Sequence, residues 1–85
     1  MISFVNPIYP VILRQANVSG DVVIDAVVDA NGNVAKMQPV SGQRLLVAAA
    51  MDAVRQWKYQ PTLLNGQPIP VIVRVTVTFR LRPYS

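Results

Sequence analysis

Two stretches of the chain alternate apolar and polar residues, and this period of two predicts β-strands. In the first, over residues 21–29, one face is apolar throughout: Val22, Ile24, Ala26 and Val28. In the last, over residues 71–81, one face carries Val71, Val73, Val75, Val77, Phe79 and Leu81. The opposite face of that last strand carries Ile72, Arg74, Thr76, Thr78, Arg80 and Arg82. Each strand therefore has one side for a core and one side for solvent.

A second strand is predicted over residues 34–40, joined to the first by a tight turn. The turn sequence Ala30-Asn31-Gly32-Asn33 contains Asn-Gly, whose residues both tolerate the positive φ that a tight turn needs. Pro39 lies within this strand and has no N–H to donate. Because proline in a sheet is confined to edges and bulges, we expect a bulge on an outer strand.

Helical periodicity appears between the second and the last strand. Over residues 45–59 a stripe recurs at helical spacing: Leu46, Ala49, Ala50, Ala53, Val54 and Trp57. Pro61 is expected to close this helix, and residues 65–68, Asn-Gly-Gln-Pro, to form a turn. A short helix over residues 10–15 follows the extended sequence Asn-Pro-Ile-Tyr-Pro, since proline is tolerated at the first helical position.

These elements predict a single α+β domain over residues 1–85. A crossover through the long helix places the last strand antiparallel beside the first, giving a three-stranded sheet of order 2-1-3 with both outer strands as edges. We expect Arg74 and Arg80 to face Asp25 and Asp29 across this pair. The predicted core consists of Val22, Ile24, Val28, Ala50, Ala53, Trp57, Val73, Val75, Val77 and Phe79.

The amino-acid composition excludes most catalytic mechanisms. The 85 residues include no cysteine and no histidine, which excludes disulfides, Cys/His zinc sites and imidazole catalysis. Residues 29–33 resemble a calcium loop only superficially, because glycine stands at their fourth position and the chain has no glutamate. We therefore expect a protein that is not an enzyme and that needs no cofactor or metal.

Charge leaves several kinds of partner open. The net charge is +4. From residue 55 onward the sequence contains no acidic residue but five basic ones: Arg55, Lys58, Arg74, Arg80 and Arg82. Such a balance suits nucleic acid, an anionic surface, an acidic protein partner or simple solubility. Nucleic acid is disfavoured, because Trp57 and Phe79 fall on apolar faces and leave no aromatic platform for bases.

The last strand is predicted to be a long and regular edge. An unpaired edge offers free N–H and C=O groups to another extended chain. Three outcomes remain open: capture of a partner's strand by β-augmentation, pairing with a second copy, or an edge that is merely tolerated.

Taken in order, these motifs resemble the C-terminal domain of TonB-type energy transducers. The resemblance rests on Tyr9-Pro10, Gly20-Asp21-Val22, residues 29–34 (Asp-Ala-Asn-Gly-Asn-Val), Ser41-Gly42, residues 49–61, residues 65–68 and the last strand. Within residues 49–61 the run Ala-Val-x-x-Trp-x-Tyr-x-Pro is the most specific part. These motifs cover nearly the whole chain.

The resemblance implies a periplasmic domain of a bacterial protein that is anchored in the inner membrane by a segment not present here. Such proteins pass proton-motive-force energy from inner-membrane motor proteins to outer-membrane transporters. Their C-terminal domain binds an extended segment at the transporter's N-terminus, the TonB box. Carried onto this sequence, the implied partner-binding residues are Ile8, Tyr9, Pro10, Ile72, Arg74, Thr76, Thr78 and Arg80.

A different parent protein is the main alternative. The domain type is also attached to other envelope proteins, such as sensors and membrane peptidases. In that case the edge would pair with its twin in a homodimer, and exchange of the last strand through a hinge over residues 62–70 is one route to it. The full-length sequence of the parent protein would distinguish these two interpretations.

Overall fold

The computed structural model describes residues 3–81, and in this part of the chain it shows two helices and five strands. In order they are α1 (Val11–Gln15), β1 (Gly20–Val28), β2 (Val34–Ser41), α2 (Arg44–Val54), β3 (Thr62–Leu64), β4 (Gln67–Ile69) and β5 (Val71–Phe79). The molecule is elongated, measuring 49 × 26 × 14 Å. No helix within residues 3–81 has the length and apolar character that crossing a bilayer requires.

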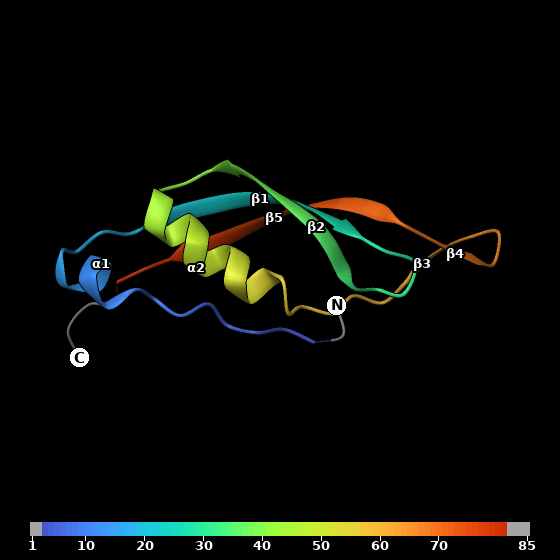
Figure 1. Cartoon of the computed structure of the whole chain (residues 1–85), viewed down its shortest axis with the longest axis horizontal. Coiled ribbons are helices and arrows are strands. Elements are labelled where there is room, and N and C mark those ends of the chain that lie inside the picture. Colours follow the sequence, from blue (N-terminus) through green and yellow to red (C-terminus); the bar gives the residue numbers. More distant parts are fainter. Residues whose placement is uncertain (1–2, 82–85) are drawn as a thin grey trace.

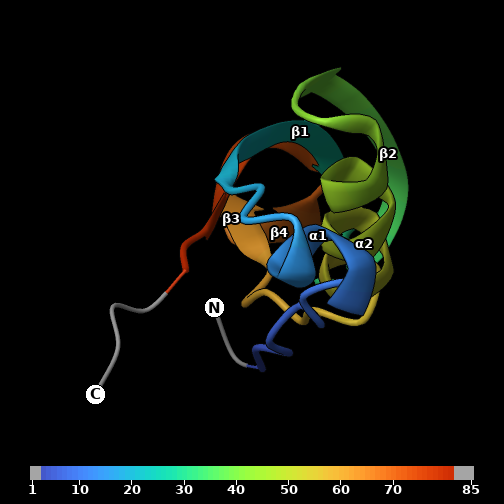
Figure 2. The same cartoon turned by 90° about the vertical axis from the view of Figure 1, so that its left-hand side faces the viewer.

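The main sheet is three-stranded and antiparallel, in the order β2-β1-β5, which confirms the predicted α+β fold and strand order. Figure 1 shows the three strands side by side along the long axis of the molecule. Figure 2, turned by 90°, shows the sheet curving over α2, so that one face is covered and the other is open. β1 is the central strand and β5 is an edge strand.

The covered face of the sheet forms the core. Inward residues of β1 are fully or almost fully buried, from Val22 to Val28, and they meet Leu46, Ala50 and Val54 of α2. The small alanines of α2 let the helix approach the strands closely. Of the predicted core residues, Val22, Ile24, Val28, Ala50, Ala53, Trp57, Val75, Val77 and Phe79 are buried, whereas Val73 is half-buried and packs against the cluster.

The start of α2 is capped by a side chain that the pattern did not reveal. Gln43 precedes the helix, and its Oε1 accepts hydrogen bonds from the N–H groups of Leu45 at 2.7 Å and Leu46 at 3.1 Å. No acidic residue stands in the first turn. The glutamine therefore satisfies two N–H groups that an N-terminal helical turn leaves without partners.

The predicted end of this helix is wrong. α2 ends at Val54, not at Tyr59, because the next residues make backbone hydrogen bonds to two distant segments. Lys58 exchanges two bonds with Ser3, at 3.0 and 3.1 Å, and the Tyr59 N–H donates to the Gly32 carbonyl at 2.8 Å. Trp57 lies three residues beyond Val54, and its N–H donates to the Val54 carbonyl at 3.0 Å, so its buried ring stays close to the helical stripe.

The segment expected to be a turn and hinge is a second, short hairpin. Residues 62–69 form the two-stranded sheet β3-β4, with only Asn65 and Gly66 as its turn. Both have positive φ, 53° and 80°, as a tight Asn-Gly hairpin turn requires. The hairpin extends from one end of the molecule in Figure 1 and exposes Leu63 and Leu64.

One of the two predicted cross-strand charge pairs is wrong. Asp25 lies opposite Arg74, as expected, but an antiparallel register then carries Arg80 away from Asp29. The ladder ends with Gly20 opposite Phe79, so Arg80 lies just beyond it, at the other end of β1 from Asp29. In a regular antiparallel ladder the numbers of two paired residues always add to the same sum. The pairs Asp25–Arg74 and Asp29–Arg80 have different sums, so they cannot both form in one ladder.

Two glycines provide a matched test of the contact between the β1–β2 turn and residue 59. Gly32 and Gly66 have similar positive φ, 85° and 80°, but a Cβ on Gly32 would lie 2.0 Å from the Tyr59 carbonyl oxygen, whereas Gly66 faces open space. We expect Gly66→Ala to cost about 1–2 kcal/mol, the backbone penalty alone. Gly32→Ala should cost clearly more in urea unfolding, and equal losses would contradict the close approach.

Candidate functional site

The outer edge of β5 is the most regular unpaired edge in the described part of the chain. β5 pairs with β1 along its whole length, from Val71 opposite Val28 to Phe79 opposite Gly20, without a register shift. Within residues 3–81 no strand pairs with its other side. The outer-face side chains Ile72, Arg74, Thr76 and Thr78 are all exposed.

The other edge of the sheet, along β2, is irregular. Its register with β1 shifts twice, once between the partners of Val23 and Ile24 and once between those of Val27 and Val28. The first shift leaves Val40 without a partner beside Pro39, which is the bulge that the proline predicts. Bulges and prolines are common protections of an edge strand. β2 is therefore a poor template for a further strand, and β5 is a good one.

An extended N-terminal segment lies beside β5. The Trp57 Nε1–H group donates to the Val5 carbonyl at 2.8 Å, and the Phe4 ring packs on the Trp57 ring with centroids 4.8 Å apart. In Figure 1 this segment runs below the sheet toward α1. The contacts with Trp57 and Lys58 thus fix residues 3–5 near the end of α2.

A groove separates this segment from the edge strand. A cavity of about 200 Å³ is lined on one side by Phe4, Asn6, Pro7 and Trp57, and on the other by Thr76, Val77 and Thr78. Its lining thus comes from the extended N-terminal segment and Trp57 on one side and from three consecutive residues of β5 on the other. Such a groove fits an extended peptide better than a compact ligand.

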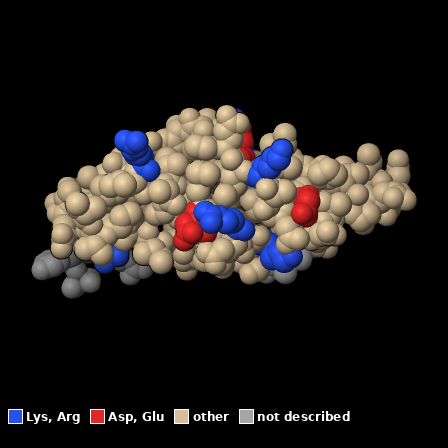
Figure 3. Space-filling view, viewed as in Figure 1, with Lys and Arg blue, Asp and Glu red and all other residues tan. Residues whose placement is uncertain are grey.

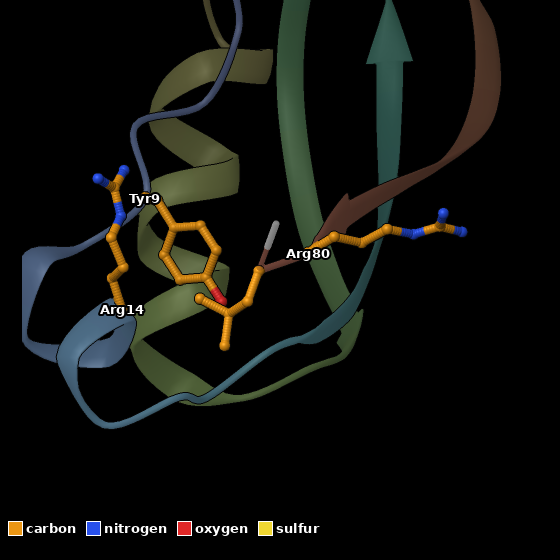
Figure 4. A pocket seen from close by; sticks show the side chains of 4 residues that line it. Tyr9, Arg14 and Arg80 are labelled. Atoms are coloured by element: carbon orange, nitrogen blue, oxygen red, sulfur yellow. The ribbon is translucent and has the colours of Figure 1, made fainter. Parts of the chain in front are cut away.

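A second hollow of about 350 Å³ lies at the end of β5, lined by Tyr9, Arg14, Arg80 and Leu81. The Tyr9 ring meets the Phe79 ring edge to face, with centroids 5.4 Å apart, and its hydroxyl donates to the Val18 carbonyl. Figure 4 shows Tyr9 between Arg14 and Arg80. The structure thus brings Tyr9 next to β5, joining two stretches that the family resemblance implies are partner-binding.

The remaining implied residues of the N-terminal stretch differ in exposure. Ile8 is 79% exposed, whereas Pro10 is half-buried and directly precedes α1. Sequence reasoning missed Phe4, Asn6, Pro7 and Arg14 as lining residues. Only the tertiary path of the N-terminal segment brings them to β5, and no local pattern encodes that path.

Arg74 is already engaged within the domain. Its Nε and Nη2 atoms donate to Asp25 Oδ1 and Oδ2 at 2.8 and 3.0 Å, a two-bond geometry that suits guanidinium and carboxylate. The hydrogen bond from Arg74 lowers the pKa of Asp25, and the same bond raises the pKa of Arg74. Burial raises the pKa of Tyr59.

Charges are scattered on the molecular face seen in Figure 3. Basic and acidic side chains lie singly or in mixed groups there, separated by uncharged surface, rather than gathering in a basic patch. The loop considered for calcium is a hairpin turn, since Asp29 Oδ1 accepts from the N–H groups of Asn31 and Asn33, both at 2.9 Å. Within residues 3–81 no three potential ligands gather around a common point.

The fold is that of a TonB C-terminal domain. The solution NMR structure of the Pseudomonas aeruginosa TonB C-terminal domain superimposes with a TM-score of 0.82, covering 99% of this chain and 87% of that one at 15% identity. The family model for the Gram-negative bacterial TonB protein C-terminal region matches residues 5–81. The chain therefore belongs to the TonB C-terminal family, which confirms the resemblance seen in its motifs.

Curated relatives agree with this assignment. The chain is 35% identical over 79 residues to protein TonB of Vibrio cholerae serotype O1, covering 91% of the chain and 32% of that protein. It is 44% identical over 77 residues to protein TonB of Xanthomonas campestris pv. campestris strain B100, covering 88% of the chain and 34% of that protein. The chain thus spans about a third of the length of these relatives.

The Asp25–Arg74 pair predicts a pH dependence of stability. Because the folded state lowers the pKa of Asp25, the stabilisation is present above the ordinary carboxyl pKa and is lost as the pH falls through the folded value. Urea unfolding of the parent and Asp25→Asn should therefore differ at pH 7 and converge near pH 2. A difference that persists unchanged at low pH would contradict an ionic contribution.

Proposed function

We propose that residues 1–85 form the periplasmic partner-binding domain of a TonB-type energy transducer. In this proposal the domain binds an extended N-terminal segment of an outer-membrane transporter, which adds a strand along β5. An inner-membrane anchor and the contacts with the motor proteins belong to parts of the protein outside this sequence. The observation that carries the proposal is the contrast between the two edges, one bulged at Pro39 and one regular over nine residues.

Strand addition on β5 suits a coupling that must be reversible. A captured segment of five to seven residues makes about five backbone hydrogen bonds, each contributing a net 0.5–1.5 kcal/mol before ordering costs. The affinity is then modest, so the domain releases its partner readily. The preformed groove beside Thr76 and Thr78 lowers the ordering cost on the domain's side.

A second candidate is self-association through the same edge, in a parent protein of another kind such as a sensor or a membrane peptidase. It is favoured by exposed apolar side chains near β5: Leu63 and Leu64 of the β3-β4 hairpin and Ile72 are 62, 58 and 73% exposed. Sedimentation over a range of concentrations distinguishes the two, since self-association makes the apparent mass rise with concentration.

A cysteine pair tests which edge receives the partner. The chain has no cysteine, so Thr76→Cys and Ser41→Cys each introduce a single thiol. Both residues lie opposite Val23, on the β5 and β2 sides of the sheet respectively, and both are exposed. The probes are synthetic N-terminal segments of outer-membrane transporters from the same genome, with one cysteine moved along the peptide.

We expect Thr76→Cys to form a disulfide with the peptide, with a yield that alternates along the peptide at a period of two, as strand pairing requires. Ser41→Cys should form little mixed disulfide. Equal yields from both variants, or a higher yield at Ser41, would contradict capture on β5. Efficient disulfide-linked homodimers of Thr76→Cys without peptide would favour self-association instead.

A further inference from the structure

We propose that Arg14 and Arg80 form a charge-selecting subsite at the end of the β5 groove, which favours a partner segment with acidic residues beside its β-paired stretch. The inference rests on the proposed capture of an extended segment by β5, and it assigns the charge selection to the end of the strand. Arg74, in the middle of β5, has no such role.

The first argument is the engagement of Arg74. Both oxygens of Asp25 accept hydrogen bonds from its guanidinium, so its charge is compensated within the domain. An acidic partner side chain would have to displace Asp25 and leave that carboxylate without its arginine. Arg74 therefore gives little net attraction to an acidic segment.

The second argument is the position of Arg80. It follows Phe79, the last paired residue of β5, so a partner strand that runs beyond the ladder reaches it. The nearest acidic residue in the register is Asp21, opposite Thr78, and no ion pair joins it to Arg80 within the described residues. Arg80 is exposed and therefore accessible to an incoming group.

Arg14 supplies the third argument. It reaches the same hollow from α1, with its guanidinium carbon 5.7 Å from the centre of the Tyr9 ring, and it forms no ion pair within residues 3–81. A cation over an aromatic face is held by the ring without losing its charge. Two uncompensated arginines therefore border a hollow whose other lining residues are Tyr9 and Leu81.

The arrangement of the two arginines indicates the shape of the ligand. In Figure 4 they lie on either side of the Tyr9 ring, and their guanidinium groups point away from each other. This divergence favours separate anionic groups over one small anion that both arginines share. A peptide segment with separate carboxylates can contact both arginines, while an apolar side chain of that segment covers Tyr9 and Leu81.

Synthetic peptides test this subsite. Three peptide probes share one Thr/Val strand sequence taken from a transporter segment. The first carries Asp-Asp at its N-terminal end, the second carries Asp-Asp at its C-terminal end, and the third carries Asn-Asn at both ends. Affinities are measured by fluorescence anisotropy for the parent domain, Arg14→Gln, Arg80→Gln, Arg80→Lys and Lys36→Gln. Lys36 is the matched control, since it is exposed on the opposite edge strand and its loss changes the net charge equally.

For one of the two acidic peptides we expect Arg14→Gln and Arg80→Gln each to weaken binding roughly two- to fivefold at low salt, with the effect fading at high salt. Arg80→Lys should restore most of the affinity. Lys36→Gln should have little effect, and the Asn peptide should bind all variants alike.

Other outcomes would overturn the subsite, the capture, or both. If every peptide binds the parent domain but Arg80→Gln and Lys36→Gln have equal effects, capture stands and the subsite is wrong. If Arg80→Gln weakens the Asn peptide as much as the acidic ones, Arg80 acts without charge selection and the subsite is wrong. If no peptide binds, both the capture and the subsite fail.

Discussion

The antiparallel ladder between β1 and β5 is the interaction on which the rest of this domain depends. It joins strands that are far apart in sequence, and it turns the inward valines of both toward α2. It also fixes Asp25 opposite Arg74. Because the ladder uses only one side of β5, the same pairing that completes the core leaves the other side as an edge. Core stability and the proposed partner capture thus depend on one register, since a slip of one residue would turn the buried side chains to solvent.

Trp57 connects the core to the candidate groove. Its ring is buried in the cluster beneath the sheet, while its indole N–H binds the Val5 carbonyl and its ring packs on Phe4. The N-terminal segment forms one wall of the groove, so the position of that wall depends on a residue of the core. Changes at Trp57 would therefore alter both folding and the groove, which makes it a poor choice for testing partner contact.

Much of the fold could be predicted from the sequence, because β1 and β5 alternate strictly and one side of each packs into the core. That pattern identified β1 and β5, and the helix that crosses over between β2 and β5 gave the strand order. The helix end was predicted wrongly since Trp57 keeps the helical phase, while the backbone bonds of Lys58 and Tyr59 to Ser3 and Gly32 are non-local. The position of Phe4, Asn6 and Arg14 near β5 could not be predicted, because the path of an extended segment leaves no periodic signal in the sequence.

Backbone pairing alone cannot give the proposed capture its specificity. Every extended segment offers the same N–H and C=O groups, so discrimination must come from side chains that meet the partner beside or beyond the ladder. Along β5 the threonines are neutral and Arg74 is compensated by Asp25. Discrimination by charge is then left to the end of the strand, where Arg80 and Arg14 border the same hollow. Separating pairing from selection in this way would let one edge accept several partner sequences, provided that each carries acidic residues at the matching end.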